Sequence, residues 1–132
     1  MRRTAPGRSA VYPRGAVIQL RRSRVADAIE TYTDQNWEKE VVASAQPVLV
    51  DFWAEWCKPC LAMVPDLEAV ALAYKGRLRV GKVNVEQNND VPFKYNVTGM
   101  PTLLVLKAGK VLDQRVGKLS KDALVKLVEP HL

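Results

Sequence analysis

The chain has 132 residues, of which 48% are hydrophobic and 26% charged, as expected for one globular domain with its own core. The formal net charge of +6 is concentrated in residues 1–26, which contain seven arginines and no acidic residue. Residues 27–132 hold 13 basic and 14 acidic side chains, which argues against a nucleic-acid partner. No apolar run approaches the roughly 20 residues of a membrane-spanning helix, so no membrane partner is expected.

Residues 1–26 are predicted to be a disordered basic extension that precedes one domain at residues 27–132. The longest apolar stretch in this extension, AVIQL, is shorter than the roughly 7–15 residues of a secretory signal core. We therefore expect a cytoplasmic protein. An arginine-rich, acid-free segment also fits an organellar transit peptide, and a start codon assigned too far upstream is a third interpretation.

The first predicted elements are a strand at residues 28–33 and a short helix capped by Asp34. The helix is expected to run through the VVAS stretch. Its predicted apolar face consists of Trp37, Val41 and Ala45.

A nearly continuous apolar run at residues 47–54 predicts a central strand that is buried on both faces. A helix is predicted from Pro59 to Lys75, with a stop at Gly76 and a kink at Pro65. Apolar residues recur along it at the spacing of one helical face: Leu61, Val64, Leu67, Val70 and Ala71.

The remaining pattern predicts further strands at residues 77–86, 102–108 and 111–117. Residues 90–96 can form one or two helical turns. Ala108-Gly109-Lys110 is typical of a hairpin turn, and Ser120 is expected to cap a last helix that reaches at least Leu127. This order predicts an α/β fold with a central mixed sheet, because the hairpin adds an antiparallel pair to parallel strands.

The only two cysteines, Cys57 and Cys60, fall between the buried strand and the helix that follows it. At a helix N-terminus, free backbone N–H groups and the helix dipole lower the pKa of a thiol. Cys57 is therefore the predicted nucleophile. Cys60, one turn deeper, is predicted to resolve the mixed disulfide. Pro59 fits the first helical turn, where a missing N–H costs little.

Other uses of the two thiols are poorly supported. A structural zinc site needs four ligands, and the chain adds only one histidine, His131, so we expect no metal site. A cysteine–histidine dyad lacks a placed histidine for the same reason. A pair of inert buried thiols remains an alternative.

The motifs DFWAEWCKPC, TGMPT and VGKLS together resemble the thioredoxin family over roughly residues 28–132, nearly the whole of the domain. The resemblance implies a thioredoxin fold, with helices on both faces of the mixed sheet. It implies a protein-disulfide reductase, a thiol-disulfide oxidoreductase that needs no cofactor beyond its Cys57–Cys60 disulfide. The implied partners are a thioredoxin reductase and proteins that contain disulfides, and the implied state is a monomer.

Several residues receive roles from the resemblance alone. Asp51 is expected to move the proton of Cys60, and Lys82 to neighbour Asp51. Pro101 is expected to follow a cis peptide bond beside the dithiol. A shallow groove for substrate is expected to be formed by Trp56, Gly99, Met100, Pro101, Val116 and Gly117. Trp53 is assigned to packing.

Alternative interpretations stay open for most of these positions. Asp51 and Lys82 fit solvated strand residues, and Trp56 and Met100 fit core packing.

Lys58 departs from the glycine that thioredoxins usually carry at this position. We expect Lys58 and Pro59, together with Lys82, to tune the reduction potential. A cation beside Cys57 should stabilise its thiolate and make the protein somewhat less reducing. A thiol oxidase or isomerase of the same fold is therefore a second hypothesis, and a binding module without turnover is a third.

Overall fold

The computed structural model of the chain describes residues 28–132, and the extension predicted at residues 1–26 lies outside them. The described residues form one five-stranded sheet with the order β1-β3-β2-β4-β5. The first three strands in this order are parallel, and β4 and β5 are antiparallel to their neighbours, which confirms the predicted mixed sheet. The strands are β1 (Ile29–Thr31), β2 (Val48–Trp53), β3 (Arg79–Asn84), β4 (Thr102–Lys107) and β5 (Lys110–Val116).

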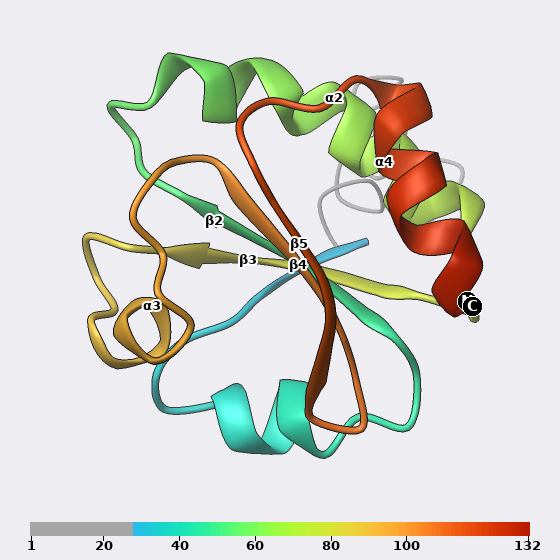
Figure 1. The fold of residues 1–132 in the computed structure, drawn as a ribbon, viewed down its shortest axis with the longest axis horizontal. Helices are drawn as coiled ribbons and strands as arrows, with labels where there is room; N and C mark the ends of the chain where they lie inside the picture. The colour runs from blue at the N-terminus through green and yellow to red at the C-terminus, as the bar shows by residue number, and fades with distance from the viewer. Residues whose placement is uncertain (1–27) are drawn as a thin grey trace, which may run out of the picture.

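Helices cover both faces of the sheet, as predicted (Figure 1). One face carries α2 (Lys58–Ala73) and α4 (Lys121–Val128), and the other carries the short π-helical segment η2 (Glu38–Val42) and α3 (Asp90–Lys94). A 3-10 turn, η3 (Glu129–His131), follows α4. Alternate residues of β2 supply the two cores, with Leu49 packed toward α2 and Val50 toward η2. The central strand is thus buried on both sides.

The hairpin between β4 and β5 and the cap of α4 agree with the sequence prediction. Ala108 and Gly109 have φ values of 52° and 79°, the left-handed pair that a two-residue type I′ turn requires. The Ser120 hydroxyl accepts a hydrogen bond from the Ala123 N–H at 3.2 Å, so Ser120 caps α4 as expected.

The prediction for Asp34 was wrong. Thr33 and Asn36 cap the segment before η2 by exchanging side-chain-to-backbone hydrogen bonds of 3.1 and 2.8 Å. Asp34 instead accepts hydrogen bonds from the backbone N–H groups of residues 89–91, at the start of α3. The carboxylate satisfies donors more than 50 residues away in the chain, which a local capping pattern cannot indicate. Ala45, predicted on the helix face, is exposed because η2 ends at Val42.

The predicted face of α2 was partly wrong. Leu61 is exposed, whereas Met63 is fully buried with Leu67 and Val70. The helix begins at Lys58 and ends at Ala73, two residues before the predicted end. The buried face starts from Cys60 and continues through Met63, so the cysteine and not Leu61 occupies the first inward position.

Candidate functional site

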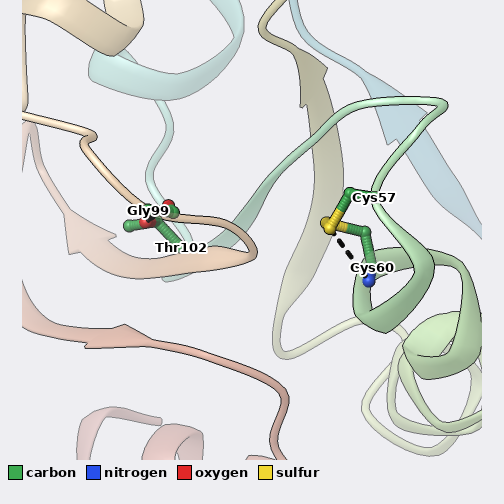
Figure 2. The surroundings of a disulfide bond; sticks show 4 residues. All are labelled: Cys57, Cys60, Gly99 and Thr102. Carbon is green, nitrogen blue, oxygen red and sulfur yellow. Dashed lines mark hydrogen bonds between the residues drawn. A yellow bond between two sulfur atoms is a disulfide. The ribbon is translucent and has the colours of Figure 1, made fainter.

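The two cysteines form a disulfide at the point where β2 leads into α2 (Figure 2). Cys57 is the N-cap residue of α2, with extended backbone angles, and its carbonyl accepts the helical hydrogen bond of Leu61 at 3.1 Å. The Cys57 sulfur accepts a hydrogen bond from the Cys60 N–H at 3.2 Å. Cys57 therefore lies at the helix N-terminus, as predicted, where the dipole and a free N–H favour a thiolate.

Both cysteines are buried while they are joined. Cys57 is 4% exposed and Cys60 1%, and they form a small apolar cluster with Ala54, against which Val85 and Met100 pack. Exposure therefore does not separate the two thiols in this oxidised state. Position on the helix separates them, because the Cys57 sulfur occupies the N-cap site.

Asp51 is a buried acid without a partner. It is 1% exposed and neither carboxylate oxygen has a hydrogen-bond partner. Burial raises the pKa of Asp51 to about 7, against an opposing effect of the Lys82 charge. By the alternation of β2, its side chain lies on the same face as Leu49, the face covered by α2. A carboxyl group with such a pKa can accept or release a proton near neutral pH.

Lys82 neighbours Asp51, but its ammonium is engaged elsewhere. The two residues are register partners on the parallel strands β2 and β3. The Lys82 Nζ lies 4.5 Å from the centroid of the Trp53 ring, and among the described residues no ion pair joins Lys82 to Asp51. The sequence assigned Trp53 to packing alone and missed this contact. The only signal of this contact in the sequence is the strand alternation that puts residues 51 and 53 on one face of the sheet.

The predicted groove residues on the β4 side come together. The peptide bond before Pro101 is cis, and the Pro101 carbonyl accepts a hydrogen bond from the Gly117 N–H at 2.8 Å. The Thr102 hydroxyl donates to the Gly99 carbonyl in the loop that leads to β4 (Figure 2). A Cβ on Gly99 would lie 3.0 Å from the Val116 side chain.

Met100 connects these groove residues on the β4 side to the sulfurs, because it packs against the apolar cluster that contains Cys57 and Cys60. Val116, on β5, is 62% exposed and Trp56 is 65% exposed. Large apolar side chains that remain this exposed are typical of binding surfaces.

Trp56 is held in place by a residue that sequence reasoning missed. Its indole N–H donates to the Glu86 carboxylate at 3.1 Å. Glu86 follows β3, and its own N–H is bonded to the Asn84 side chain at 2.9 Å. This hydrogen bond favours one orientation of the exposed ring, although no motif pairs residues 56 and 86.

Lys58 and Pro59 are the first residues of α2, and both are exposed. Among the residues that the structure describes, no carboxylate pairs with Lys58. No group of three or more metal-ligating side chains occurs within residues 28–132. No helix in the same part of the chain is long and apolar enough to cross a membrane.

Comparison with known proteins gives a consistent result. The family model described as thioredoxin matches residues 28–130. A thioredoxin of Acidithiobacillus ferridurans is 46% identical over 108 residues, which cover 82% of this chain and all of the relative. A thioredoxin of Pseudomonas aeruginosa is 43% identical over the same shares. A thioredoxin of Chlorobaculum thiosulfatiphilum is 41% identical over 76% of this chain and 93% of its own length.

Proposed function

Because the chain belongs to the thioredoxin family and is a thiol-disulfide oxidoreductase, we propose that it reduces protein disulfides by attack through Cys57 and resolution through Cys60. The observation that carries the proposal is the Cys57–Cys60 disulfide at the N-terminus of α2. There the Cys57 sulfur lies at the N-terminal end of a helix, an environment that stabilises a thiolate.

The reaction transfers two electrons from the dithiol to the substrate. The Cys57 thiolate attacks one sulfur of a substrate disulfide, which forms a mixed disulfide and releases the first substrate thiolate. The Cys60 thiolate then attacks the Cys57 sulfur, which forms the Cys57–Cys60 disulfide and releases the second substrate thiolate. Both released thiolates take up protons, so the substrate disulfide becomes a dithiol.

Asp51 is the proposed acceptor of the Cys60 proton. Cys60 is buried in an apolar cluster, and such surroundings disfavour its thiolate. A base is therefore needed at the resolving step. The pKa of Asp51, raised to about 7 by burial, suits a group that must take a proton and later release it near neutral pH.

The proposed substrate groove lies on the β4 side of the sulfurs, with Trp56 on the rim. A substrate segment in extended conformation would lie along the half-buried Met100 and against the exposed Val116, and both side chains would supply apolar contact. The proposed partners are disulfide-containing proteins and a thioredoxin reductase that returns the disulfide to the dithiol. The disulfide itself is the redox centre, as in other thioredoxins, and no further cofactor enters the scheme.

We propose that the protein acts as a monomer in the cytoplasm. Its extension at residues 1–26 is not expected to contribute to reduction. Removal of these residues should leave the melting temperature and the reduction rate nearly unchanged. A large loss of either would show that the extension packs on the domain. A mature N-terminus mapped near residues 25–28 in the native cell would favour organellar import instead.

Two cysteine variants test the mechanism. Cys60→Ser should attack a substrate disulfide and accumulate a mixed disulfide through Cys57, visible as a mass increase that a reductant removes. Cys57→Ser should be inactive and form no adduct. Limited iodoacetamide at neutral pH should label Cys57 of the reduced protein well before Cys60. Adduct formation by Cys57→Ser, or equal labelling of both thiols, would reverse or remove the assignment.

A thiol oxidase is the second candidate, and the exposed Lys58 beside Cys57 favours it. Equilibration of the purified dithiol with glutathione distinguishes the two directions. A reductase should show a reduction potential near −270 mV, and an oxidase one near −120 mV.

A further inference from the structure

Three side chains from β2 and β3 form a layered arrangement on the face of the sheet that α2 covers. Asp51 and Trp53 alternate along β2, so they point to the same face, and Lys82 is the register partner of Asp51 on β3. The Lys82 ammonium lies over the Trp53 ring at 4.5 Å from its centroid. The lysine therefore uses the aromatic ring as its partner and not the nearer strand neighbour, Asp51.

The missing ion pair is not a matter of reach. Neighbouring strands lie roughly 4.8 Å apart, and the flexible four-carbon stem of a lysine spans that separation. Both oxygens of Asp51 are buried and have no hydrogen-bond partner. A free acceptor and a cation thus lie side by side on adjacent strands, and something must keep them apart.

The surroundings of Lys82 explain where its charge is stable. A pocket of about 310 Å³ opens beside it, lined by Trp53, Glu68 and Asn84 among other residues. Over the ring, the ammonium has the face of the aromatic side chain that attracts cations best, and the open pocket leaves it room for water. At Asp51 the same ammonium would have to give up that water in a fully buried position, which is costly.

We propose that Trp53 is a positioning residue of the reaction, whose ring holds the Lys82 ammonium at the pocket and withholds it from the Asp51 carboxylate. The inference rests on the proposed role of Asp51 and extends it. A direct ion pair would hold Asp51 permanently ionised and would make it a weak acceptor for the Cys60 proton. With Lys82 on the ring, Asp51 feels the lysine charge only from a distance.

Lys82 is the charged group that acts on Asp51, and the other charged side chains around the pocket do not pair with the Asp51 carboxylate. On α2, Glu68 lines the pocket, and on β1, Glu30 also lines it and is paired with Arg79. The β4 register partner of Asp51 is Leu103, which carries no charge. Lys82 is accordingly the charge that opposes the effect of burial on the pKa of Asp51.

The test is a titration of the Asp51 carboxyl carbon by NMR, in the full chain with the disulfide formed. The variants are Trp53→Leu, Trp53→Phe and Lys82→Gln, with each Trp53 change also made in the Lys82→Gln background. In the presence of Lys82, Trp53→Leu should lower the pKa of Asp51 by about one unit, a roughly tenfold change in proton affinity. Trp53→Phe, which keeps a ring, should cause a smaller fall in the same direction.

The Lys82→Gln background distinguishes a positioning role of Trp53 from an effect of Trp53 on the hydration of Asp51. If the loss of the indole acted by admitting water near Asp51, the fall in the pKa of Asp51 would be the same with or without Lys82. We expect the fall in pKa to disappear almost entirely in the Lys82→Gln background, which is the non-additivity of two coupled residues. If Trp53→Leu fails to fold, the Trp53→Phe pair makes the same comparison with a smaller shift.

Equal shifts in the two backgrounds, or no shift in either, would overturn the inference. The pH midpoint of mixed-disulfide resolution should move with the pKa of Asp51, and a midpoint that stays at its original value while the pKa moves would contradict the role proposed for Asp51. Equal or absent pKa shifts would leave that role unaffected. That role fails separately, if Asp51→Asn resolves mixed disulfides at the original rate.

Discussion

At the start of β3, the Arg79 guanidinium donates hydrogen bonds to the Glu30 carboxylate at 3.0 and 2.5 Å and to the Glu40 carboxylate at 2.8 Å. It also donates to the Glu40 carbonyl and lies over the ring of Tyr32. Near the other end of the same strand, Lys82 makes no ion pair within the described residues, and its neighbour Asp51 accepts no hydrogen bond.

The contrast separates a charge that stabilises the fold from charges to which we assign a proposed role in its chemistry. Arg79 joins β1, β3 and the segment η2, and its bonds leave few donors unused. A native fold rarely leaves a buried polar group unsatisfied, and the exceptions need an explanation. Asp51 is such an exception, and it lies on the strand that leads to the disulfide. The Cys57–Cys60 disulfide follows the carboxyl end of β2, and parallel sheets commonly bind ligands at this end of their strands.

The largest expected effect comes from removing the unsatisfied charge. The folded pKa of Asp51, about 7, is higher than the unfolded value of about 3.9. Between these values the folded state holds a proton that the unfolded state has lost, so wild-type stability falls as pH rises. Asp51→Asn should therefore be more stable than wild type at pH 8, by up to about 4 kcal/mol.

Urea unfolding at several pH values measures this difference. The advantage of Asp51→Asn should be nearly lost at pH 4 and should vanish about one pH unit below the unfolded pKa, where wild-type Asp51 is protonated in both states. An advantage that does not change between pH 4 and pH 8 would show that the carboxylate is not destabilised by burial.

Removal of the satisfied charge should have the opposite sign. Arg79→Gln leaves the carboxylates of Glu30 and Glu40 without their donor, and we expect a loss of about 2 kcal/mol in the free energy of unfolding. The matched control is Arg115→Gln, which removes the ion pair between Arg115 and Asp113 on the exposed strand β5. We expect this variant to lose less than about 1 kcal/mol in the free energy of unfolding. Equal losses in the two variants would contradict the structural role of Arg79.

The Asp34 carboxylate has hydrogen-bond partners, so its removal should destabilise the fold. Its carboxylate accepts hydrogen bonds of 2.9–3.2 Å from three backbone N–H groups at the start of α3. Asp34→Ala should lower the free energy of unfolding by about 1–2 kcal/mol, the typical cost of losing a helix cap. Asp34→Asn, which keeps one acceptor oxygen, should lose less. If Asp34→Ala were more stable than wild type at neutral pH, the Asp34 carboxylate would destabilise the fold, as we expect for Asp51.

Lys58 is an exposed charge, and its effect should be the smallest. At about 6 Å from the Cys57 sulfur, an exposed ammonium should stabilise the thiolate by less than about 1 kcal/mol. Lys58→Gly should then raise the pKa of the Cys57 thiol in the reduced protein by a fraction of a unit and lower the reduction potential by roughly 10–20 mV. High salt should reduce both changes together. An unchanged thiol pKa, or a higher potential, would show that the lysine points away from the sulfur.

Much of the fold was predictable because its signals are local. The apolar run of β2, the turn at Gly109 and the cap at Ser120 each depend on residues close in the chain, and the structure has them where they were expected. The position of Cys57 at a helix start follows in the same way, since a buried strand directly precedes it. The mixed sheet follows from the order of the elements.

The parts that were missed depend on register and on contacts between distant segments. Asp34 was assigned to the nearest helix, yet its acceptors meet donors that the fold brings from residues 89–91. Trp53 was assigned to packing because only the register of β2 on β3 places Lys82 beside it. No sequence pattern indicated the role of Glu86, because its hydrogen-bond partner Trp56 lies 30 residues away in the chain.

The rate at which Cys60 resolves a mixed disulfide tests the account most directly. After rapid mixing of the reduced protein with a chromogenic aromatic disulfide, release of the second coloured thiolate reports this step. In wild type the rate should rise through an inflection near pH 7, where Asp51 ionises. Asp51→Asn should lack that inflection and be slower at pH 7 by about 100-fold, the lower range for loss of a general base. Superimposable pH profiles for the two proteins would contradict a role for Asp51 in moving the Cys60 proton.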